Sequence, residues 1–318
     1  MGTKAERRKE LREIIGGMLN SSAVDLSQNE MSKRIGISPS ALSTWLQGKY
    51  KGSDTEIERK IERWLESYNA GEEYTRELPP EPEWIETPTA RRIFQTLETG
   101  QFLKSLVMAY GAAGAGKTKT CEYYAATRPN VWLFTPTKAT ASARGLLMLI
   151  CDKLGISDPG SGNYAIQKAI MRKVAGTNGL IIIDEAQQIT LGALDLMRQM
   201  QEQAGIGMAL VGNEPLYTQM TGGFRGPKFA QLFSRIAQRT HIEGTQSDDV
   251  ETLADALGIT DRDAVAYLVR IGTLPGGLRG VAKTLQLAQL AAAGSGGELN
   301  KAIIARAWRK LTNTEVQA

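Results

Sequence analysis

The sequence has 318 residues, of which 42% are hydrophobic, 38 are Lys or Arg and 34 are Asp or Glu, so its formal net charge is +4. This length suits two or three domains, and the weak positive charge permits nucleic-acid binding without requiring it. No apolar run is long enough to span a membrane, no N-terminal apolar segment indicates export, and two cysteines exclude a disulfide framework. We therefore expect a cytoplasmic protein. The single histidine, His241, excludes a multi-histidine metal site, and we expect it to be structural.

The first 70 residues are charged and helical in their periodicity, and they contain the pattern of a helix-turn-helix. A helix is predicted from Glu30 to Ile35, with a turn at Gly36. A second helix is predicted to begin at Ser38 and Pro39, because serine favours the N-cap and proline favours the first helical position. The residues of its apolar face, which we expect to pack inward, are Leu42, Trp45 and Leu46.

The opposite face of this second helix is polar, and a helix of this kind can enter the major groove of DNA. Its short hydroxyl side chains, with no arginine among them, predict modest sequence specificity. A small helical bundle that binds protein or no ligand is the alternative. The residues that we expect to contact DNA are Ser40, Ser43, Thr44, Gln47 and Lys49.

Composition shifts divide the rest of the chain into three segments. Residues 71–88 contain four prolines, which predicts a semi-extended linker that is not helical. Residues 89–245 alternate between short apolar runs and amphipathic segments, which predicts an α/β fold with a doubly wound parallel sheet and helices on both faces. Residues 246–318 lack strand patterns and predict four helices. Within the α/β segment, strands are expected at 105–110, 131–137, 180–186, 206–214 and 240–244, with the last helix at 228–239.

The spacing of glycine, lysine and threonine after the first predicted strand fits a phosphate-binding loop. The pattern Gly-x-x-x-x-Gly-Lys-Thr runs from Gly111 to Thr118, between a β-prone segment and a segment of good helix formers. Its backbone N–H groups would bind phosphate oxygens, Lys117 would contact the β- and γ-phosphates, and Thr118 would ligate Mg²⁺. A flexible Gly/Ala loop that happens to contain a lysine is the alternative. The residues expected to bind the nucleotide are Gly111, Ala112, Ala113, Gly114, Ala115, Gly116, Lys117, Thr118 and Lys119.

An acidic pair follows a second apolar run. The run from Leu180 to Ile183 is typical of a central parallel strand, and Asp184 and Glu185 stand at its carboxyl end, where ligands of open α/β sheets bind. Asp184 would ligate Mg²⁺, and Glu185 would polarise the attacking water. Asn213, at the end of the next strand, would orient this water, unless it only initiates a turn.

Two arginines are expected to act on the phosphates. Arg235, near the end of the helix before the last strand, would stabilise charge on the phosphoryl group of a neighbouring subunit; Arg239 and Arg225 are rivals for this role. Arg279 follows two glycines at the start of a C-terminal helix, which could direct it at the nucleotide. A solvated surface arginine is the alternative for Arg279.

Together these segments resemble the AAA+ ATPases and, more narrowly, the Mu B family of phage transposition proteins. The resemblance covers nearly the whole chain. It implies a Cro-like helix-turn-helix domain at 1–70, a linker at 71–88, an AAA+ P-loop core at 89–245 and a helical lid domain at 246–318. The segments that carry it are NEMSKRIGIS, GKYKG, ERWLESY, GAAGAGKT, GLIIIDEAQ, LVGNEPLYTQMTGG and FAQLFSRIAQRT.

The resemblance implies an ATP-dependent DNA-binding protein that selects target DNA and activates a transposase. It also implies Mg²⁺-dependent ATP hydrolysis and a homo-oligomer that forms a helical filament on double-stranded DNA, with hydrolysis causing release. Lys138 and Arg144, just after a predicted strand, are expected as further DNA contacts. The alternatives are a helicase- or clamp-loader-type ATPase that remodels a protein partner, and an ATP-switched helix-turn-helix regulator that recognises an operator.

Overall fold

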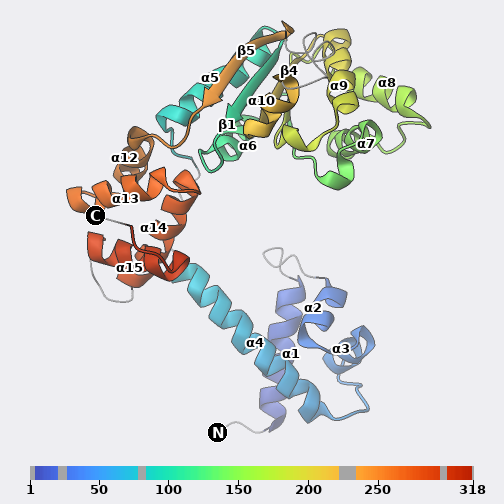
Figure 1. Cartoon of the computed structure of the whole chain (residues 1–318). Coiled ribbons are helices and arrows are strands. Elements are labelled where there is room, and N and C mark those ends of the chain that lie inside the picture. The colour runs from blue at the N-terminus through green and yellow to red at the C-terminus, as the bar shows by residue number, and fades with distance from the viewer. Residues whose placement is uncertain (1–3, 21–26, 78–83, 222–233, 294–298, 317–318) are drawn as a thin grey trace. The chain divides into compact units, whose positions relative to one another are not determined.

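The computed structural model describes residues 4–20, 27–77, 84–221, 234–293 and 299–316 (Figure 1). The chain divides into two compact units, Met1–Pro79 and Pro80–Ala318. Among the described residues, no helix has both the length and the apolar character needed to cross a membrane.

The N-terminal unit is a bundle of four helices around a small core. Leu42 and Trp45 of its third helix are fully buried, as predicted, against apolar residues of the other three helices. Ser38 caps this helix, because its Oγ accepts a 3.1 Å hydrogen bond from the backbone N–H of Ala41. The predicted pair of helices around Gly36 is confirmed. The four helices are α1 (Lys4–Asn20), α2 (Gln28–Ile35), α3 (Pro39–Leu46) and α4 (Asp54–Glu77).

The helix α4 corrects the expected linker. It continues to Glu77, so the prediction that 71–88 is not helical was wrong for 71–77. The physical reason is that the first proline of this segment is Pro79, and a proline restricts its own backbone and that of the residue before it, not residues further upstream. Residues 84–87 are not helical, as predicted, and Thr87 caps the next helix, which begins at Pro88.

The second unit contains a five-stranded parallel sheet in the order β2-β3-β4-β1-β5. Alternate residues of β1 point to opposite faces: Met108 joins one apolar cluster, and Val107 joins the other. Helices cover both faces, which confirms the predicted fold class (Figure 1). The strands are β1 (Leu106–Gly111), β2 (Val131–Phe134), β3 (Leu180–Ile183), β4 (Gly207–Gly212) and β5 (Ile236–Ile242).

One layer of helices contributes to the cluster with Val107, and the other contributes to the cluster with Met108. The helices α5 and α10 were not expected from the sequence. On the first face lie α5 (Pro88–Phe102) and α6 (Lys117–Thr127); on the second lie α7 (Ala143–Leu154), α8 (Asn163–Val174), α9 (Leu191–Ala204) and α10 (Glu214–Thr221).

The last strand begins earlier than predicted. Strand β5 starts at Ile236, where a helix was expected to continue to residue 239, and Ile236 pairs with Leu106 of β1. Pairing along the whole length of β1 decides this boundary, and such long-range pairing overrides local helix propensity. The part of the predicted helix at 228–233 lies outside the described residues.

The C-terminal part of the second unit is the predicted four-helix domain. Its core is built around Trp308, Leu268 and Leu285. It is joined to the sheet domain by Asp249, whose buried carboxylate accepts hydrogen bonds from the backbone N–H of Thr89 at 2.8 Å and from its Oγ1 at 2.7 Å. The helices are α12 (Ser247–Ala256), α13 (Arg262–Thr273), α14 (Gly277–Ala293) and α15 (Lys301–Thr312).

Candidate nucleotide-binding site

Two glycines of the glycine-rich loop between β1 and α6 combine a positive φ angle with packing that leaves no room for a side chain. The φ angle is 133° at Gly111 and 81° at Gly114, in the region that disfavours other residues. A Cβ on Gly111 would lie 2.1 Å from the carbonyl oxygen of Ile242, and one on Gly114 would lie 2.1 Å from that of Gly276. The loop is thus packed against β5 on one side and against the four-helix domain on the other.

Lys117 is the first residue of α6, and its ammonium group is buried beneath this loop. Its Nζ donates hydrogen bonds to the carbonyl oxygens of Gly111 at 3.1 Å and Ala112 at 2.7 Å, and to Oδ1 of Asn213 at 3.0 Å. Burial lowers the pKa of Lys117, and the nearby carboxylates of Asp184 and Glu185 oppose this effect. Three oxygen atoms therefore fix the ammonium group of Lys117 beneath the loop.

Asp184 lies directly beneath the threonine of the loop. Its side chain is buried, and its Oδ2 accepts a 2.7 Å hydrogen bond from Oγ1 of Thr118. Its Oδ1 accepts a 2.9 Å hydrogen bond from the backbone N–H of Glu185. Glu185 has φ 50°, a conformation that non-glycine residues adopt rarely and that is enriched at functional sites.

Asn213 directly follows β4 and forms hydrogen bonds with Lys117 and with Gln187. Besides accepting from Lys117, it donates its backbone N–H to Oε1 of Gln187 at 3.1 Å. Gln187 in turn donates its Nε2 to Oε2 of Glu185. The sequence indicated Asn213 and Glu185, but not the glutamine that connects them.

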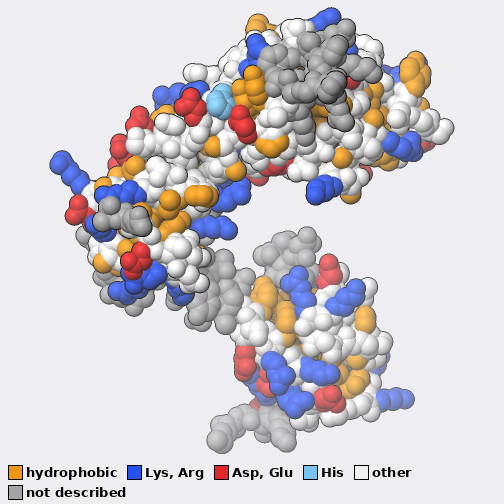
Figure 2. Space-filling view, viewed as in Figure 1, with side chains coloured by type: hydrophobic (Ala, Val, Ile, Leu, Met, Phe, Trp, Pro, Cys, Tyr) orange, Lys and Arg blue, Asp and Glu red, His pale blue; other side chains and the backbone are white. Residues whose placement is uncertain are grey.

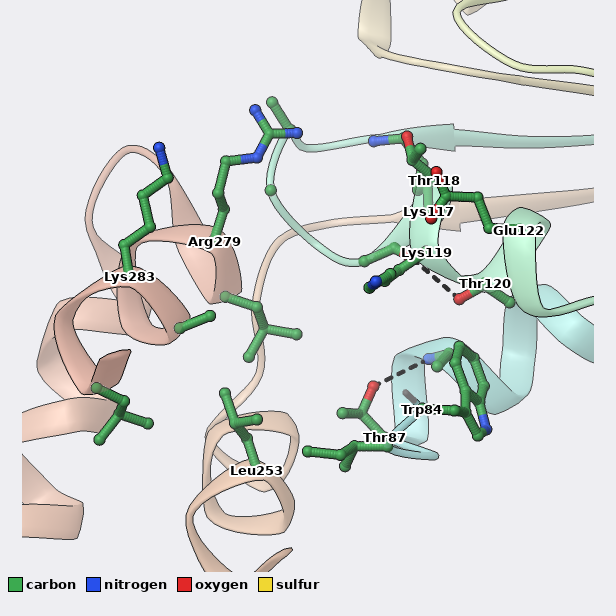
Figure 3. A pocket seen from close by; sticks show the side chains of 18 of the residues that line it. Trp84, Thr87, Lys117, Thr118, Lys119, Thr120, Glu122, Leu253, Arg279 and Lys283 are labelled. Atoms are coloured by element: carbon green, nitrogen blue, oxygen red, sulfur yellow. Dashed lines mark hydrogen bonds between the residues drawn. The ribbon is translucent and has the colours of Figure 1, made fainter. Parts of the chain in front are cut away.

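A pocket of about 540 Å³ opens between the glycine-rich loop and the four-helix domain (Figure 3). Lys117, Thr118, Glu185 and Asn213 line it from the sheet domain, and Arg279 lines it from α14, as predicted. Ala113, Gly114, Gly116 and Lys119 also line it. Among the other expected loop residues, Ala115 is buried in the core beneath the loop, and Gly111 and Ala112 contribute carbonyl oxygens to Lys117.

Several lining residues were not found from the sequence. Lys283 lies one helical turn after Arg279, and this spacing of four residues could have indicated it. Trp84 lines the pocket from the segment before α5 and stacks on Tyr123, with ring centroids 4.3 Å apart and planes at 0°. No spacing signal marked Trp84, because it stands alone in a proline-rich segment. The apolar residues of the opposite wall are Leu253, Leu257 and Leu278.

Arg235 lies away from the pocket of its own chain. It directly precedes β5, at the end of the sheet where Ile236 pairs with Leu106, whereas the loop follows Gly111 at the other end. A strand rises about 3.3 Å per residue, so the two ends of β1 are about 17 Å apart. The guanidinium is exposed and donates a 3.0 Å hydrogen bond to Glu202. Of its two rivals, Arg239 lies within β5, and Arg225 lies outside the described residues.

The residues expected to contact DNA lie on both units. On the N-terminal unit Ser40, Gln47 and Lys49 are exposed, and Ser43 and Thr44 are half-buried. The hydroxyl of Thr44 donates to the carbonyl oxygen of Ser40 at 2.8 Å. On the second unit, the exposed Lys138 lies in the 3-10 helix η1 (Lys138–Thr140), and the exposed Arg144 lies in the first turn of α7. Basic and acidic side chains are interspersed on the visible face of both units (Figure 2).

His241 lies in β5, in the strand where it was expected. Its ring stacks on Tyr110 with centroids 4.9 Å apart, and its Nε2 lies 3.2 Å from Oε2 of Glu214.

Comparison with known proteins places this geometry in a family. The family model described as Mu B transposition protein, C terminal, matches residues 234–311, and the model described as AAA domain matches residues 101–220. The ATP-dependent target DNA activator B of Escherichia phage Mu is 36% identical over 276 residues, which cover 87% of this chain and 87% of the relative. This chain belongs to the Mu B family of transposition proteins.

A second relative agrees with this assignment, and a solved structure agrees with the fold. Another member of the Mu B family, the Mu-like prophage FluMu DNA transposition protein B of Haemophilus influenzae, is 38% identical over 261 residues, or 81% of this chain and 90% of the relative. Among solved structures, the Aeropyrum pernix ORC2 protein in its ADPNP-ADP complexes aligns with a TM-score of 0.52 and 19% identity, covering 72% of this chain and 67% of that one. This likeness supports the AAA+ fold.

Proposed function

We propose that this Mu B family member is an ATPase that binds double-stranded DNA as an ATP-dependent oligomer and delivers target DNA to a transposase. The observation that supports it most directly is the convergence of Lys117, Thr118, Asn213 and Arg279 on one pocket. The buried Asp184 is joined to this group by its hydrogen bond with Thr118. The names of the relatives, an ATP-dependent target DNA activator and a DNA transposition protein, support the same assignment. The proposed place of action is the host cytoplasm.

Each residue of the pocket has a proposed role in phosphoryl transfer. Lys117 and the loop N–H groups would bind the β- and γ-phosphates, and Arg279 would approach them from α14. Glu185 would accept a proton from the attacking water, and Asn213 would orient this water. Burial of Lys117 and Asp184 makes their interactions with phosphate and metal stronger than they would be in water.

The oxygen atoms of Thr118 and Asp184 fit a magnesium ion. They are 2.7 Å apart, and hydroxyl and carboxylate oxygens are the ligands that this hard cation prefers. These two residues would hold Mg²⁺ together with the phosphates of the nucleotide. When bound, the ion neutralises charge on the β- and γ-phosphates.

The base of the nucleotide is proposed to lie between Trp84 and the leucines of the four-helix domain. This part of the pocket is lined by Leu253, Leu257 and Leu278, and an apolar slot suits the flat faces of an adenine ring. The stack of Trp84 on Tyr123 holds the indole in a fixed orientation.

The position of Arg235 supports the proposed oligomer. Because its own phosphate loop lies at the far end of β1, Arg235 would serve the pocket of a neighbouring subunit. Bound ATP would then stabilise the oligomer, since the phosphates are shared across the interface. Many subunits on one DNA convert weak contacts at Lys49, Lys138 and Arg144 into strong multivalent binding. A helical filament is the proposed form of this oligomer.

The test is DNA binding by the full chain with ATP, with ADP and without nucleotide, on duplexes of unrelated sequence, combined with negative-stain imaging. We expect filaments and tight binding with ATP alone, similar affinities for all duplexes, and a linear fall of log affinity with log salt of about 0.9 per phosphate contact. A footprint at one operator would support the regulator instead. ATP turnover stimulated by a protein partner but not by DNA would support a remodelling ATPase.

A further inference from the structure

Gln187 occupies a central position between the two strands that carry the proposed catalytic groups. It lies in the 3-10 helix η2 (Ala186–Gln188), which directly follows the acidic end of β3. Its amide is used at both ends: Nε2 donates to Oε2 of Glu185, and Oε1 accepts the backbone N–H of Asn213 at 3.1 Å. One side chain therefore joins the end of β3 to the end of β4.

The space that the side chain of Gln187 occupies depends on a glycine in β4, Gly212. A Cβ on Gly212 would lie only 2.4 Å from Oε1 of Gln187, closer than nonbonded atoms approach. The backbone of Gly212 is in ordinary extended strand conformation, which any residue can adopt. Glycine is therefore needed here because it leaves room for the amide of Gln187, and not because of its φ angle. Any residue with a Cβ at this position would displace the amide of Gln187.

The bonds of Gln187 extend to the phosphate loop. Asn213, which donates its backbone N–H to Gln187, accepts the ammonium of Lys117 at Oδ1 with a distance of 3.0 Å. The hydrogen-bonded series is thus Glu185, Gln187, Asn213, Lys117. It links the carboxylate proposed to activate water with the lysine proposed to hold the phosphates.

A general base works best when a third group fixes its orientation. The amide of Gln187 binds one oxygen of Glu185 and leaves the other for the water. Without this bond the carboxylate would rotate among several orientations, and misplacement of a reacting group by about 1 Å can cost about 100-fold in rate. The same change would leave the binding of the phosphates intact, because Gln187 does not bond to Lys117 directly but is separated from it by Asn213.

We propose that Gln187 is a positioning residue, which orients the carboxylate of Glu185 for water activation and ties this orientation to Asn213. This inference rests on the proposed function, that the pocket hydrolyses ATP. It assigns Gln187 to the hydrolysis step and not to nucleotide binding.

The experiment compares six variants of the full chain, two of them in a Gln187→Ala background, by steady-state ATP turnover with DNA and by direct titration of ATP binding. Gln187→Met keeps the size of the side chain and removes both hydrogen bonds. Gln187→Glu keeps an acceptor for Asn213 but places a second carboxylate against Glu185. Gly212→Ala leaves Gln187 in place but adds a Cβ that displaces its side-chain amide. Gln188→Met, at the neighbouring position, is the matched control.

We expect kcat to fall at least tenfold in Gln187→Met and in Gln187→Glu, with KM and the Kd for ATP within about twofold of the wild type. Gly212→Ala should lower kcat similarly when Gln187 is present. In a Gln187→Ala background, where the Cβ meets no amide, it should change kcat by less than twofold, which is the signature of a coupled pair. Gln188→Met should behave as the wild type.

The inference is overturned if Gln187→Met keeps the wild-type kcat. It is also overturned if kcat and ATP affinity fall together in a Gln187 variant whose thermal unfolding is unchanged. A third contrary result is that Gly212→Ala lowers kcat by the same factor with Gln187 and with Gln187→Ala. These outcomes leave the proposed function standing, because the wild type still hydrolyses ATP. Absence of ATP turnover in the wild type would instead overturn the proposed function, and this inference with it.

Discussion

Lys117 and Asn213 stand 96 positions apart in the sequence, and a 3.0 Å hydrogen bond joins the Nζ of the first to the Oδ1 of the second. This bond connects the phosphate loop after β1 with the end of β4, two strands that are neighbours in the sheet. The lysine is thereby aligned before the nucleotide makes contact with it, which lowers the ordering cost of binding. Both side chains therefore belong to one site, in which we propose that nucleotide binding and hydrolysis depend on different residues.

Lys117→Ala and Glu185→Gln should separate nucleotide binding from hydrolysis. Without Lys117, the phosphates lose their buried cation, so ATP-dependent DNA binding should be abolished. With Glu185→Gln, ATP should still bind, turnover should fall at least 100-fold, and the DNA complex should persist. Filter binding with ATP, followed over time after excess competitor DNA is added, measures both effects. A Glu185→Gln variant with wild-type turnover would contradict the assignment.

Trp84→Ala should weaken the binding of ATP more than the binding of inorganic tripolyphosphate. The indole lines the apolar part of the pocket, so its removal affects the base and leaves the phosphate loop intact. A loss of about tenfold in ATP affinity corresponds to about 1.4 kcal/mol, within the range of one aromatic contact. Competition against a fluorescent nucleotide measures both ligands. Trp132→Ala, a half-buried tryptophan on β2 outside the pocket, is the control. An equal loss for both ligands would contradict the base site.

Asp249→Asn should destabilise the junction between the sheet domain and the four-helix domain. The carboxylate of Asp249 is buried and accepts hydrogen bonds from the N–H and Oγ1 of Thr89 and from the N–H of Gln246. An asparagine turns an NH₂ group toward one of these donors, which should lower the free energy of unfolding by about 2–4 kcal/mol. Urea unfolding measures this change. Asp248→Asn, at the exposed neighbouring position, should change it by less than about 0.5 kcal/mol.

Stability should fall at high pH because of Tyr124. Burial raises the pKa of Tyr124 to about 12 from the ordinary value of 10.0, and its hydroxyl donates a 2.6 Å hydrogen bond to Gln101. Between pH 10 and 12 the native state holds the proton more tightly than the unfolded state does. The free energy of unfolding therefore decreases with pH there, by up to about 1.4 kcal/mol per pH unit from this group.

Tyr124→Phe is the control for this pH dependence. It should be less stable at pH 8 by about 1–3 kcal/mol, since Oε1 of Gln101 loses the hydrogen bond from Tyr124. It should also lose the part of the alkaline decrease that comes from Tyr124. Urea unfolding of both proteins at pH 8 and at pH 11 gives the comparison, and equal alkaline losses in the two proteins would contradict the assignment.

The sequence predicted those parts of the site whose chemistry is local. Gly111 to Thr118 and Asp184 with Glu185 were identified because each motif lies within a few residues and directly follows an apolar strand. The same holds for the four C-terminal helices, whose apolar periodicity is sustained over 10 residues or more. Short apolar strands between turn signals also identified the α/β class.

The parts that were missed depend on contacts between distant segments. The start of β5 at Ile236 follows from its pairing with Leu106, 130 positions earlier in the sequence. Gln187 gains its position only when β3 and β4 are side by side, and Trp84 gains its position only when Tyr123 is beneath it. No local spacing encodes these contacts.

The central claim, that ATP is hydrolysed between subunits of a DNA-bound oligomer, is tested most directly by mixing Arg235→Ala with Lys117→Ala and measuring ATP turnover on DNA. An Arg235→Ala subunit keeps an intact Lys117 pocket, and a Lys117→Ala subunit keeps the arginine that would complete it; an arginine supplied in this way contributes about 10³-fold or more in rate. The matched control is a mixture of Lys117→Ala with Glu185→Gln, in which every pocket carries a defect of its own. We predict turnover in the first mixture, none in the control and none in either variant alone. No recovery in the first mixture, with wild-type turnover strictly proportional to protein concentration, would contradict this claim.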